Sequence, residues 1–314
     1  MWAWTRRILI GACLALVVAV LAGATYQWVA TRRELATTPP PGRLVDVGGH
    51  KLHIWCIGSG TPTVVLENGL GGMSAEWGFV QPEAARFTRV CSYDRAGIGY
   101  SDSGPPRRTA RRLARELAQL LDRSGVSGPS VLVGASIGGF PIRVFASDYA
   151  DRVAGLVLVD ATHEDQLDDV PRLAAFVPLL SSTGVLRLLG MSFGPRPETL
   201  APPVRRFARA TQFRATAYNA AADELLHVRE SAAEVRASRR TLTVPLVVVT
   251  AGRGTDRAWR ILQQDQMRLS QRGCQMIAAE SGHVVPIDQP EAVVNAIRAI
   301  VAAVRTGSGT GPCG

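Results

Sequence analysis

The sequence is poor in lysine and has no metal-binding motif. Lys51 is its only lysine, so the formal net charge of +9 comes from arginine. The arginines lie in short scattered pairs, such as Arg107-Arg108 and Arg239-Arg240, and no nucleic-acid-binding motif accompanies them. No Cys-x-x-Cys or cysteine–histidine spacing typical of a metal site occurs. We therefore expect neither a metal ion nor a nucleic-acid partner.

Charge is also scarce overall, which excludes a disordered chain. Charged residues make up 19% of the sequence and hydrophobic residues 46%, a composition typical of globular proteins. A chain of 314 residues can bury a substantial core and accommodate one domain with an insertion.

The N-terminal segment differs from the rest. No charged side chain occurs from Ile8 to Ala30, between Arg6-Arg7 and Arg32-Arg33. About 20 apolar residues cross a bilayer as a helix. We favour an uncleaved anchor over residues 1–36, because Tyr26 and Trp28 extend the apolar run with interfacial aromatics.

A cleaved signal peptide is the alternative, since the small residues Ala22-Gly23-Ala24 resemble a cleavage site. Either interpretation places the folded domain outside the cytoplasm, membrane-anchored or secreted. Four cysteines lie outside the apolar segment, an even number for an oxidising compartment. Disulfides and buried free thiols both remain open for Cys56, Cys91, Cys274 and Cys313.

Beyond a proline-rich linker at residues 37–42, strand-like and helix-like stretches alternate. The expected strands are Arg43–Val47, Lys51–Ile57, Thr63–Glu67, Thr88–Tyr93, Ser130–Val133, Val153–Val159, Leu246–Thr250 and Cys274–Ala279. The expected helices are Thr109–Ser124, Ile137–Asp148, Gln266–Arg272 and Pro290–Arg305. Strands that are apolar at every position are typical of a mainly parallel sheet covered by helices on both faces, an α/β fold.

This alternation stops at residues 162–240, where no strand-like run occurs and apolar residues follow a helical period. We expect a helical cap there, inserted into a core of residues 43–161 and 241–305. The low-complexity segment 306–314 is expected to be a flexible tail.

The stretch Gly134-Ala135-Ser136-Ile137-Gly138 follows a predicted strand and opens a predicted helix. This is the G-x-S-x-G nucleophile elbow in the context that it requires. Gly134 and Gly138 allow the tight turn, which exposes the Ser136 hydroxyl at a helix N-terminus where backbone N–H groups favour negative charge. Ser136 is therefore the candidate nucleophile.

Three further residues complete the candidate reaction site. The N–H groups of Ile137 and Leu70, the latter in a glycine-rich loop, are the candidate oxyanion-hole donors. His283 lies far downstream of Ser136, after the last strand, as the candidate base that accepts the serine proton.

These motifs and their flanks, including residues 42–72, 89–102, 131–146, 157–166 and 281–290, resemble the α/β-hydrolase superfamily. They look most like its membrane-anchored or secreted esterase-like members. The resemblance covers about Arg43–Arg305. It implies an α/β-hydrolase fold with an eight-stranded sheet and a cap after strand 6, a serine–histidine–acid triad, and no cofactor. Asn68 and Ala135 depart from the family pattern, because a histidine is common at each position.

The resemblance also bears on the triad acid and on two cysteines. Asp160 ends a strand immediately before the cap, and some family members supply the acid from there. Asp256 follows the strand that most members use, but its spacing is irregular and it could instead cap a helix. We favour Asp160 and keep Asp256 as the alternative. The family's strand order also implies that Cys56 and Cys91 lie on neighbouring strands, where a disulfide is possible.

The leading functional hypothesis is hydrolysis of a carboxylic ester, lipid-like, lactone or xenobiotic, through an acyl-enzyme on Ser136. A cofactor-free C–C hydrolase or a perhydrolase would use the same triad. A non-catalytic exported binding module is the alternative from another class. The predicted partners are a small-molecule ester and a membrane; the sequence leaves the oligomeric state undetermined.

Overall fold

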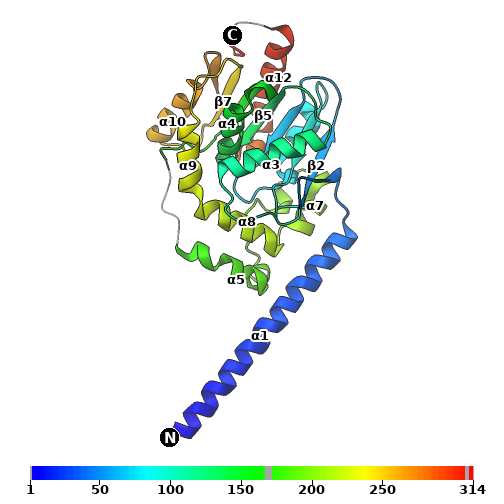
Figure 1. Cartoon of the computed structure of the whole chain (residues 1–314), viewed down its shortest axis with the longest axis vertical. Coiled ribbons are helices and arrows are strands. Elements are labelled where there is room, and N and C mark those ends of the chain that lie inside the picture. Colours follow the sequence, from blue (N-terminus) through cyan, green and yellow to red (C-terminus); the bar gives the residue numbers. More distant parts are fainter. Residues whose placement is uncertain (1, 167–171, 308–310, 314) are drawn as a thin grey trace.

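A computed structural model describes residues 2–166, 172–307 and 311–313. The described chain forms one eight-stranded sheet in the order β1-β2-β4-β3-β5-β6-β7-β8 (Figure 1). The strands are β1 (Arg43–Asp46), β2 (Lys51–Ile57), β3 (Val64–Glu67), β4 (Val90–Tyr93), β5 (Ser130–Ala135), β6 (Val153–Val159), β7 (Leu246–Ala251) and β8 (Gly273–Ala278). Strand β2 runs antiparallel to both of its neighbours, whereas β4, β3, β5, β6, β7 and β8 pair in parallel. The α/β-hydrolase fold expected from the sequence is confirmed.

Alternating strand residues face two separate apolar layers. Leu132 packs in the layer that contains α3 (Ala110–Arg123) and α4 (Gly139–Asp148). Val131 and Val133 pack in the opposite layer, with α2 (Val80–Ala84) and α12 (Pro290–Thr306). Because both faces of each central strand are buried, most positions carry an apolar residue, which is the pattern that predicted a covered parallel sheet.

The segment between β6 and β7 is helical over its described residues. Its α-helices are α5 (Val177–Ser182), α6 (Val185–Leu188), α7 (Arg205–Thr211), α8 (Ala215–Leu226) and α9 (Val228–Ala237), joined by short 3-10 turns. Figure 1 shows α5, α7 and α8 below the sheet, whereas α9 lies beside α4. The range 162–240 predicted as a cap thus contains a helical insertion after β6, and residues 167–171 of it lie outside the described residues.

The predicted helix Gln266–Arg272 is wrong. Helix α10 instead spans Arg257–Met267, because the Asp256 carboxylate accepts a hydrogen bond from Trp259 N–H and starts the helix there. The chain then turns through Ser270, whose carbonyl accepts from Gly273 N–H, and enters β8.

Two disulfides hold distant segments together. Cys56 and Cys91 lie directly opposite each other on β2 and β4 and form a disulfide, as the resemblance suggested. A second bridge joins Cys274 to Cys313. The segment 306–314, expected to be a flexible tail, is thus tied covalently to β8; residues 308–310 and 314 of it lie outside the described residues.

A long N-terminal helix, α1 (Trp2–Thr37), extends away from the rest of the molecule (Figure 1). By length and composition its Trp4–Thr37 portion is apolar enough to cross a membrane, and an 18-residue window within it has a mean hydropathy of 2.6. Met1 lies outside the described residues.

Candidate active site

Ser136 lies at a sharp turn where β5 gives way to a 3-10 helix, Ser136–Gly138, that leads into α4. Its φ of +51° is a left-handed conformation that non-glycine residues rarely adopt, and such strain is characteristic of functional sites. A side chain at Gly134 would place its Cβ 2.7 Å from Gly138 O, and one at Gly138 would collide with Asn68 O. The elbow therefore requires glycine at both positions.

The structure brings Ser136, His283 and Asp160 together from three loops at the carboxyl ends of strands. Ser136 Oγ lies 2.9 Å from His283 Nε2. His283 Nδ1 lies 2.7 Å from Asp160 Oδ2. Asp160 is 1% exposed and also has a positive φ, +40°, directly after β6. These contacts form a continuous hydrogen-bonded chain from hydroxyl to carboxylate.

The other carboxylate oxygen of Asp160 is also fixed. Asp160 Oδ1 accepts hydrogen bonds from Ala251 N–H at 3.0 Å and from the Trp259 indole Nε1–H at 2.9 Å. The Trp259 ring also meets the His283 ring edge-on, with centroids 6.0 Å apart. Trp259 thus contacts both Asp160 and His283, a position that the sequence analysis did not identify.

Asp256, the alternative acid, has a different position. Its side chain accepts the Trp259 backbone N–H at 2.7 Å as the N-cap of α10. Asp160, and not Asp256, is the aspartate hydrogen-bonded to His283. As this N-cap, Asp256 begins the helix that carries the Trp259 indole.

The predicted oxyanion donors lie on either side of Ser136. Ile137 is the second residue of the 3-10 helix, and early helix N–H groups have no intrahelical acceptor. Leu70 lies in the loop after β3 and lines the same cavity as Ser136. Gly69 approaches so closely that a Cβ there would lie 3.3 Å from Ser136 Cβ.

Arg95 is hydrogen-bonded to the backbone of this loop. Its guanidinium, 3% exposed, donates to Asn68 O and to Gly69 O, both at 2.7 Å. The same group pairs with Glu67 at the end of β3 and, through Nε and Nη2 at 2.9 and 2.8 Å, with Glu224 of α8. Burial alone would lower the pKa of Arg95, but the two carboxylates raise it. Arg95 therefore joins the candidate oxyanion loop to the cap, which the sequence analysis did not predict.

A cavity of about 280 Å³ opens beside Ser136 and His283. Most of the side chains around it are apolar, and they come from the oxyanion loop, the cap and the loop of His283. These residues are Leu70, Trp77, Phe193, Pro195, Val284 and Pro286. A second cavity of about 400 Å³, between core and cap, includes none of the three residues of the hydrogen-bonded chain in its lining.

One carboxyl group interrupts the apolar wall. Glu76 lines the cavity, and its Oε1 accepts a hydrogen bond from Met73 N–H at 3.1 Å. Burial raises the pKa of Glu76 to about 7, although this hydrogen bond opposes the shift. The carboxyl thus holds its proton at pH values where an exposed glutamate is ionised.

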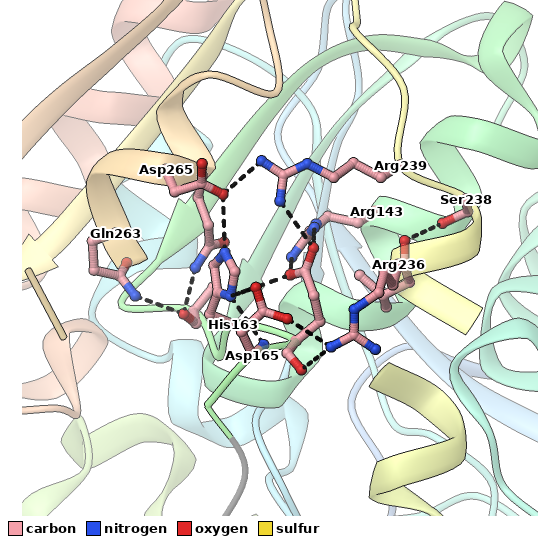
Figure 2. Close-up of polar contacts among 12 residues, drawn as sticks. Arg143, His163, Asp165, Arg236, Ser238, Arg239, Gln263 and Asp265 are labelled. Carbon is pink, nitrogen blue, oxygen red and sulfur yellow. Dashed lines mark hydrogen bonds and ion pairs between the residues drawn. The ribbon is translucent and has the colours of Figure 1, made fainter. Parts of the chain in front are cut away.

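His163, in the first residues of the cap insertion, belongs to a separate polar cluster (Figure 2). Its Nε2 lies 3.1 Å from Asp265 Oδ2 of α10. Glu164 accepts two hydrogen bonds from Arg143 of α4, at 2.6 and 2.8 Å, and one from Arg239 at 3.2 Å. Burial would raise the pKa of Glu164, but Arg143 lowers it to about 2. The cluster fastens both ends of the cap to the core.

Among the described residues, no group of three or more histidine, cysteine, aspartate or glutamate side chains is placed to hold a metal ion.

Residues 64–296 of the chain match the sequence model of a protein family described as the Alpha/beta hydrolase family. The chain therefore belongs to the α/β-hydrolase family, and this membership supports a hydrolase.

Solved structures of the same fold cover nearly the whole globular part. Cfl2 from Burkholderia cenocepacia has a TM-score of 0.67 at 24% identity, over 82% of this chain and 95% of that one. A thermophilic esterase from Thermogutta terrifontis has a TM-score of 0.63 at 23% identity, over 84% of this chain and 99% of the esterase chain.

Curated relatives match only in part. A probable transporter, efuK, of Hormonema carpetanum is 34% identical over 129 residues, which are 38% of this chain and 18% of that protein. A putative carbamate hydrolase, RutD, of Azorhizobium caulinodans is 38% identical over 106 residues, 33% of this chain and 38% of that protein. The chain aligns with 35% of the length of a relative from Schizosaccharomyces pombe and with 21% of the length of one from Saccharomyces cerevisiae.

Proposed function

We propose that this protein is a serine hydrolase that cleaves carboxylic esters through an acyl-enzyme on Ser136. The observation that carries the proposal is the hydrogen-bonded chain from Ser136 Oγ through His283 to Asp160, with separations of 2.9 and 2.7 Å. A serine is a weak nucleophile until an adjacent base accepts its proton, and this arrangement supplies the base and a group that orients it.

In this mechanism His283 Nε2 removes the hydroxyl proton as Ser136 Oγ attacks the ester carbonyl. The N–H groups of Leu70 and Ile137 stabilise the oxyanion that develops. His283 then returns the proton to the departing alcohol, which leaves an acyl group on Ser136. Water, deprotonated by the same histidine, hydrolyses this ester in the second half of the cycle. Asp160 fixes the imidazole tautomer and stabilises its protonated form.

The cavity favours an apolar acyl group. Its wall is formed largely by Leu70, Phe193 and Val284 and their neighbours, which cannot hydrogen-bond to a polar chain. The acid of Glu76 is the exception.

A fluorophosphonate probe tests the proposal on the full chain, together with p-nitrophenyl esters of graded chain length. Wild type should label and hydrolyse, and Ser136→Ala should do neither. A matched control is Ser281→Ala, since Ser281 is a serine two residues before His283 whose hydroxyl donates to Gly282 O. Labelling that persists in Ser136→Ala would refute the acyl-enzyme; labelling without ester turnover would favour the C–C hydrolase or perhydrolase alternative. No labelling of wild type would favour a binding module.

We also propose that α1 is retained as a membrane anchor, with the catalytic domain outside the cytoplasm. The helix continues without a break through Ala22-Gly23-Ala24, where a signal peptidase would have to cleave. Beyond that point Gln27, 4% exposed, donates to Phe213 O of the cap at 2.5 Å. The two disulfides fit an oxidising compartment.

Sequencing of the mature N-terminus tests the anchor. A start at Thr25 would show that the segment is cleaved. Recovery of the intact N-terminus in the membrane pellet, resistant to high-salt washing, is the expected result, because apolar insertion is not screened by salt.

A further inference from the structure

The second half of α1 packs against the cap rather than against the sheet. Its contact residues Gly23, Gln27, Thr31 and Glu34 are spaced three or four apart and so share one face of the helix. Arg187 of α6 donates to Gln27 Oε1 at 2.8 Å and to both carboxylate oxygens of Glu34 at 2.6 and 2.9 Å. The anchor and the cap are therefore fixed relative to each other.

These contacts set the depth of the α5–α6 hairpin relative to a membrane. Gly23 lies so close to Thr183, at the turn between α5 and α6, that a Cβ at Gly23 would collide with the Thr183 carbonyl. Tryptophan and arginine side chains are typical of the headgroup level, and the Arg32 guanidinium lies 4.4 Å from the Trp28 ring centroid. Gly23 is five residues deeper along the helix than Trp28, which is about 7.5 Å at 1.5 Å per residue.

The α5–α6 hairpin exposes apolar side chains, as a segment inside a bilayer at the depth of Gly23 would. Between Phe176 and Met191, five large apolar side chains are more than half exposed. They are Phe176 at 57%, Leu179 at 59%, Leu188 at 70%, Leu189 at 65% and Met191 at 56%. Arg187 is the only charged residue in this stretch, and its charge is paired with Glu34. Outside α1 and this stretch, only Ile261 and Ile277 among the described large apolar side chains are more than half exposed.

The same segment continues into the wall of the active-site cavity. Two residues after Met191, Phe193 lines the cavity beside Ser136. Its ring is tilted against that of Tyr218, with centroids 5.6 Å apart, and the Tyr218 hydroxyl donates to Met191 O. The exposed apolar surface and the catalytic cavity therefore share one stretch of chain.

We propose that residues 176–191, which we term the docking hairpin, insert their exposed apolar side chains into the lipid bilayer that holds α1. Several large apolar side chains exposed on one short segment mark an interaction surface. An apolar helix face inserts about 5–10 Å into the headgroup and acyl boundary. Because α1 and the cap are in fixed contact, the bilayer that α1 crosses lies next to this surface. The inference rests on the anchor proposed above and deepens the proposed function: the esters that reach Ser136 by this route are amphipathic, with an acyl chain that partitions into the membrane.

Fluorescence quenching in lipid vesicles tests the insertion. In the full chain with Cys13→Ala, which removes the free cysteine, single cysteines at Leu188, Leu16 and Ile261 carry an environment-sensitive fluorophore. The vesicles are of dioleoylphosphatidylcholine, with brominated acyl chains as the quencher. Leu16 of α1 reports on the anchor, and Ile261, exposed on α10, is the matched control.

We expect quenching at Leu188 and Leu16 but not at Ile261. Quenching at Leu16 with a Leu188 signal like that of Ile261 would overturn the docking hairpin while leaving the anchor intact. No quenching at Leu16 would refute the anchor, and the docking proposal would fall with it.

A kinetic experiment separates docking from catalysis. Leu188→Glu/Leu189→Glu should reduce turnover of a long-chain ester embedded in these vesicles at least about tenfold, because charges now face the acyl region. Hydrolysis of a soluble short-chain ester should be unchanged, and Ile261→Glu should alter neither. Equal turnover of the vesicle-borne ester, or an equal loss on both substrates, would overturn the proposal. Failure of wild type to cleave the soluble ester would instead refute the esterase.

Discussion

Asp160 and Asp256 can be distinguished by comparing single substitutions to asparagine. Asp160→Asn should lower kcat by about 10⁴-fold, because the His283 imidazole loses the group that fixes its tautomer. Asp256→Asn should have a small effect, since an asparagine also caps a helix. Steady-state kinetics on a p-nitrophenyl ester measures both. A collapse of Asp256→Asn alone would assign the acid to Asp256.

Trp259 offers a sharper test of the same acid. Trp259→Phe keeps the ring against His283 but removes the indole N–H that Asp160 Oδ1 accepts at 2.9 Å. With one donor lost, the carboxylate is less well oriented, and we expect kcat to fall about tenfold with KM nearly unchanged. The pH–rate profile of kcat/KM provides the second measurement: a changed profile would show that the indole acts through Asp160 and His283, whereas an unchanged profile and rate would assign it to packing alone.

Glu76 should make stability depend on pH in the direction opposite to most carboxylates. Its folded pKa of about 7 lies above the ordinary glutamate value, so between about pH 4.5 and 7 the unfolded chain loses a proton that the folded protein keeps. The free energy of unfolding should therefore fall as pH rises across this window, by up to about 3 kcal/mol from this group. Glu76→Gln should remove that slope in denaturant titrations. Glu83→Gln, a surface control, should keep it.

At the scale of elements, the ends of the cap depend on Glu164. The Arg143 guanidinium holds its folded pKa near 2, below the unfolded value, so its contribution is present above about pH 4.5 and is lost as pH falls toward 2. Glu164→Gln should remove up to about 3 kcal/mol at pH 7, because Arg143 and Arg239 lose a buried partner.

Hydrogen exchange in α9 and α10 is the measurement that locates this effect. We expect faster exchange there in Glu164→Gln than in wild type, with the β-sheet protected. Uniformly faster exchange throughout the molecule would contradict a role confined to the cap ends.

Which elements the sequence could predict depended on whether their determinants are local. The elbow could be found because Gly134, Ser136 and Gly138 lie within five residues and between a strand and a helix. Trp259 could not, because its role depends on where the first turn of α10 lies relative to the end of β6, 99 residues earlier. Arg95 was missed for the same reason, since its partner Glu224 is 129 residues away. Glu76 has no local signature, because a glutamate before an apolar run usually begins an ordinary helix.

At the scale of the whole molecule, the Cys56–Cys91 bridge links β2 to β4 across a separation of 35 residues. Closing a loop of this size in the unfolded chain corresponds to about 4 kcal/mol. Cys56→Ala/Cys91→Ala should lower the free energy of unfolding by approximately that amount in guanidinium titrations. Cys13→Ala, which removes a thiol in no disulfide, should leave it unchanged. A double variant as stable as wild type would mean that the unfolded state is already compact.

The Arg95 bridge has a consequence for attempts to re-engineer specificity by chimaeras. A designer who grafts the cap of another hydrolase onto this core would treat residues 162–240 as an independent module. Yet Glu224 from that module neutralises a guanidinium 3% exposed, whose other bonds shape the loop at Asn68 and Gly69. A graft without a carboxylate there would leave Arg95 buried with half its ionic partners, a change that costs several kcal/mol. The transplantable unit is therefore the cap together with Arg95 and the loop after β3.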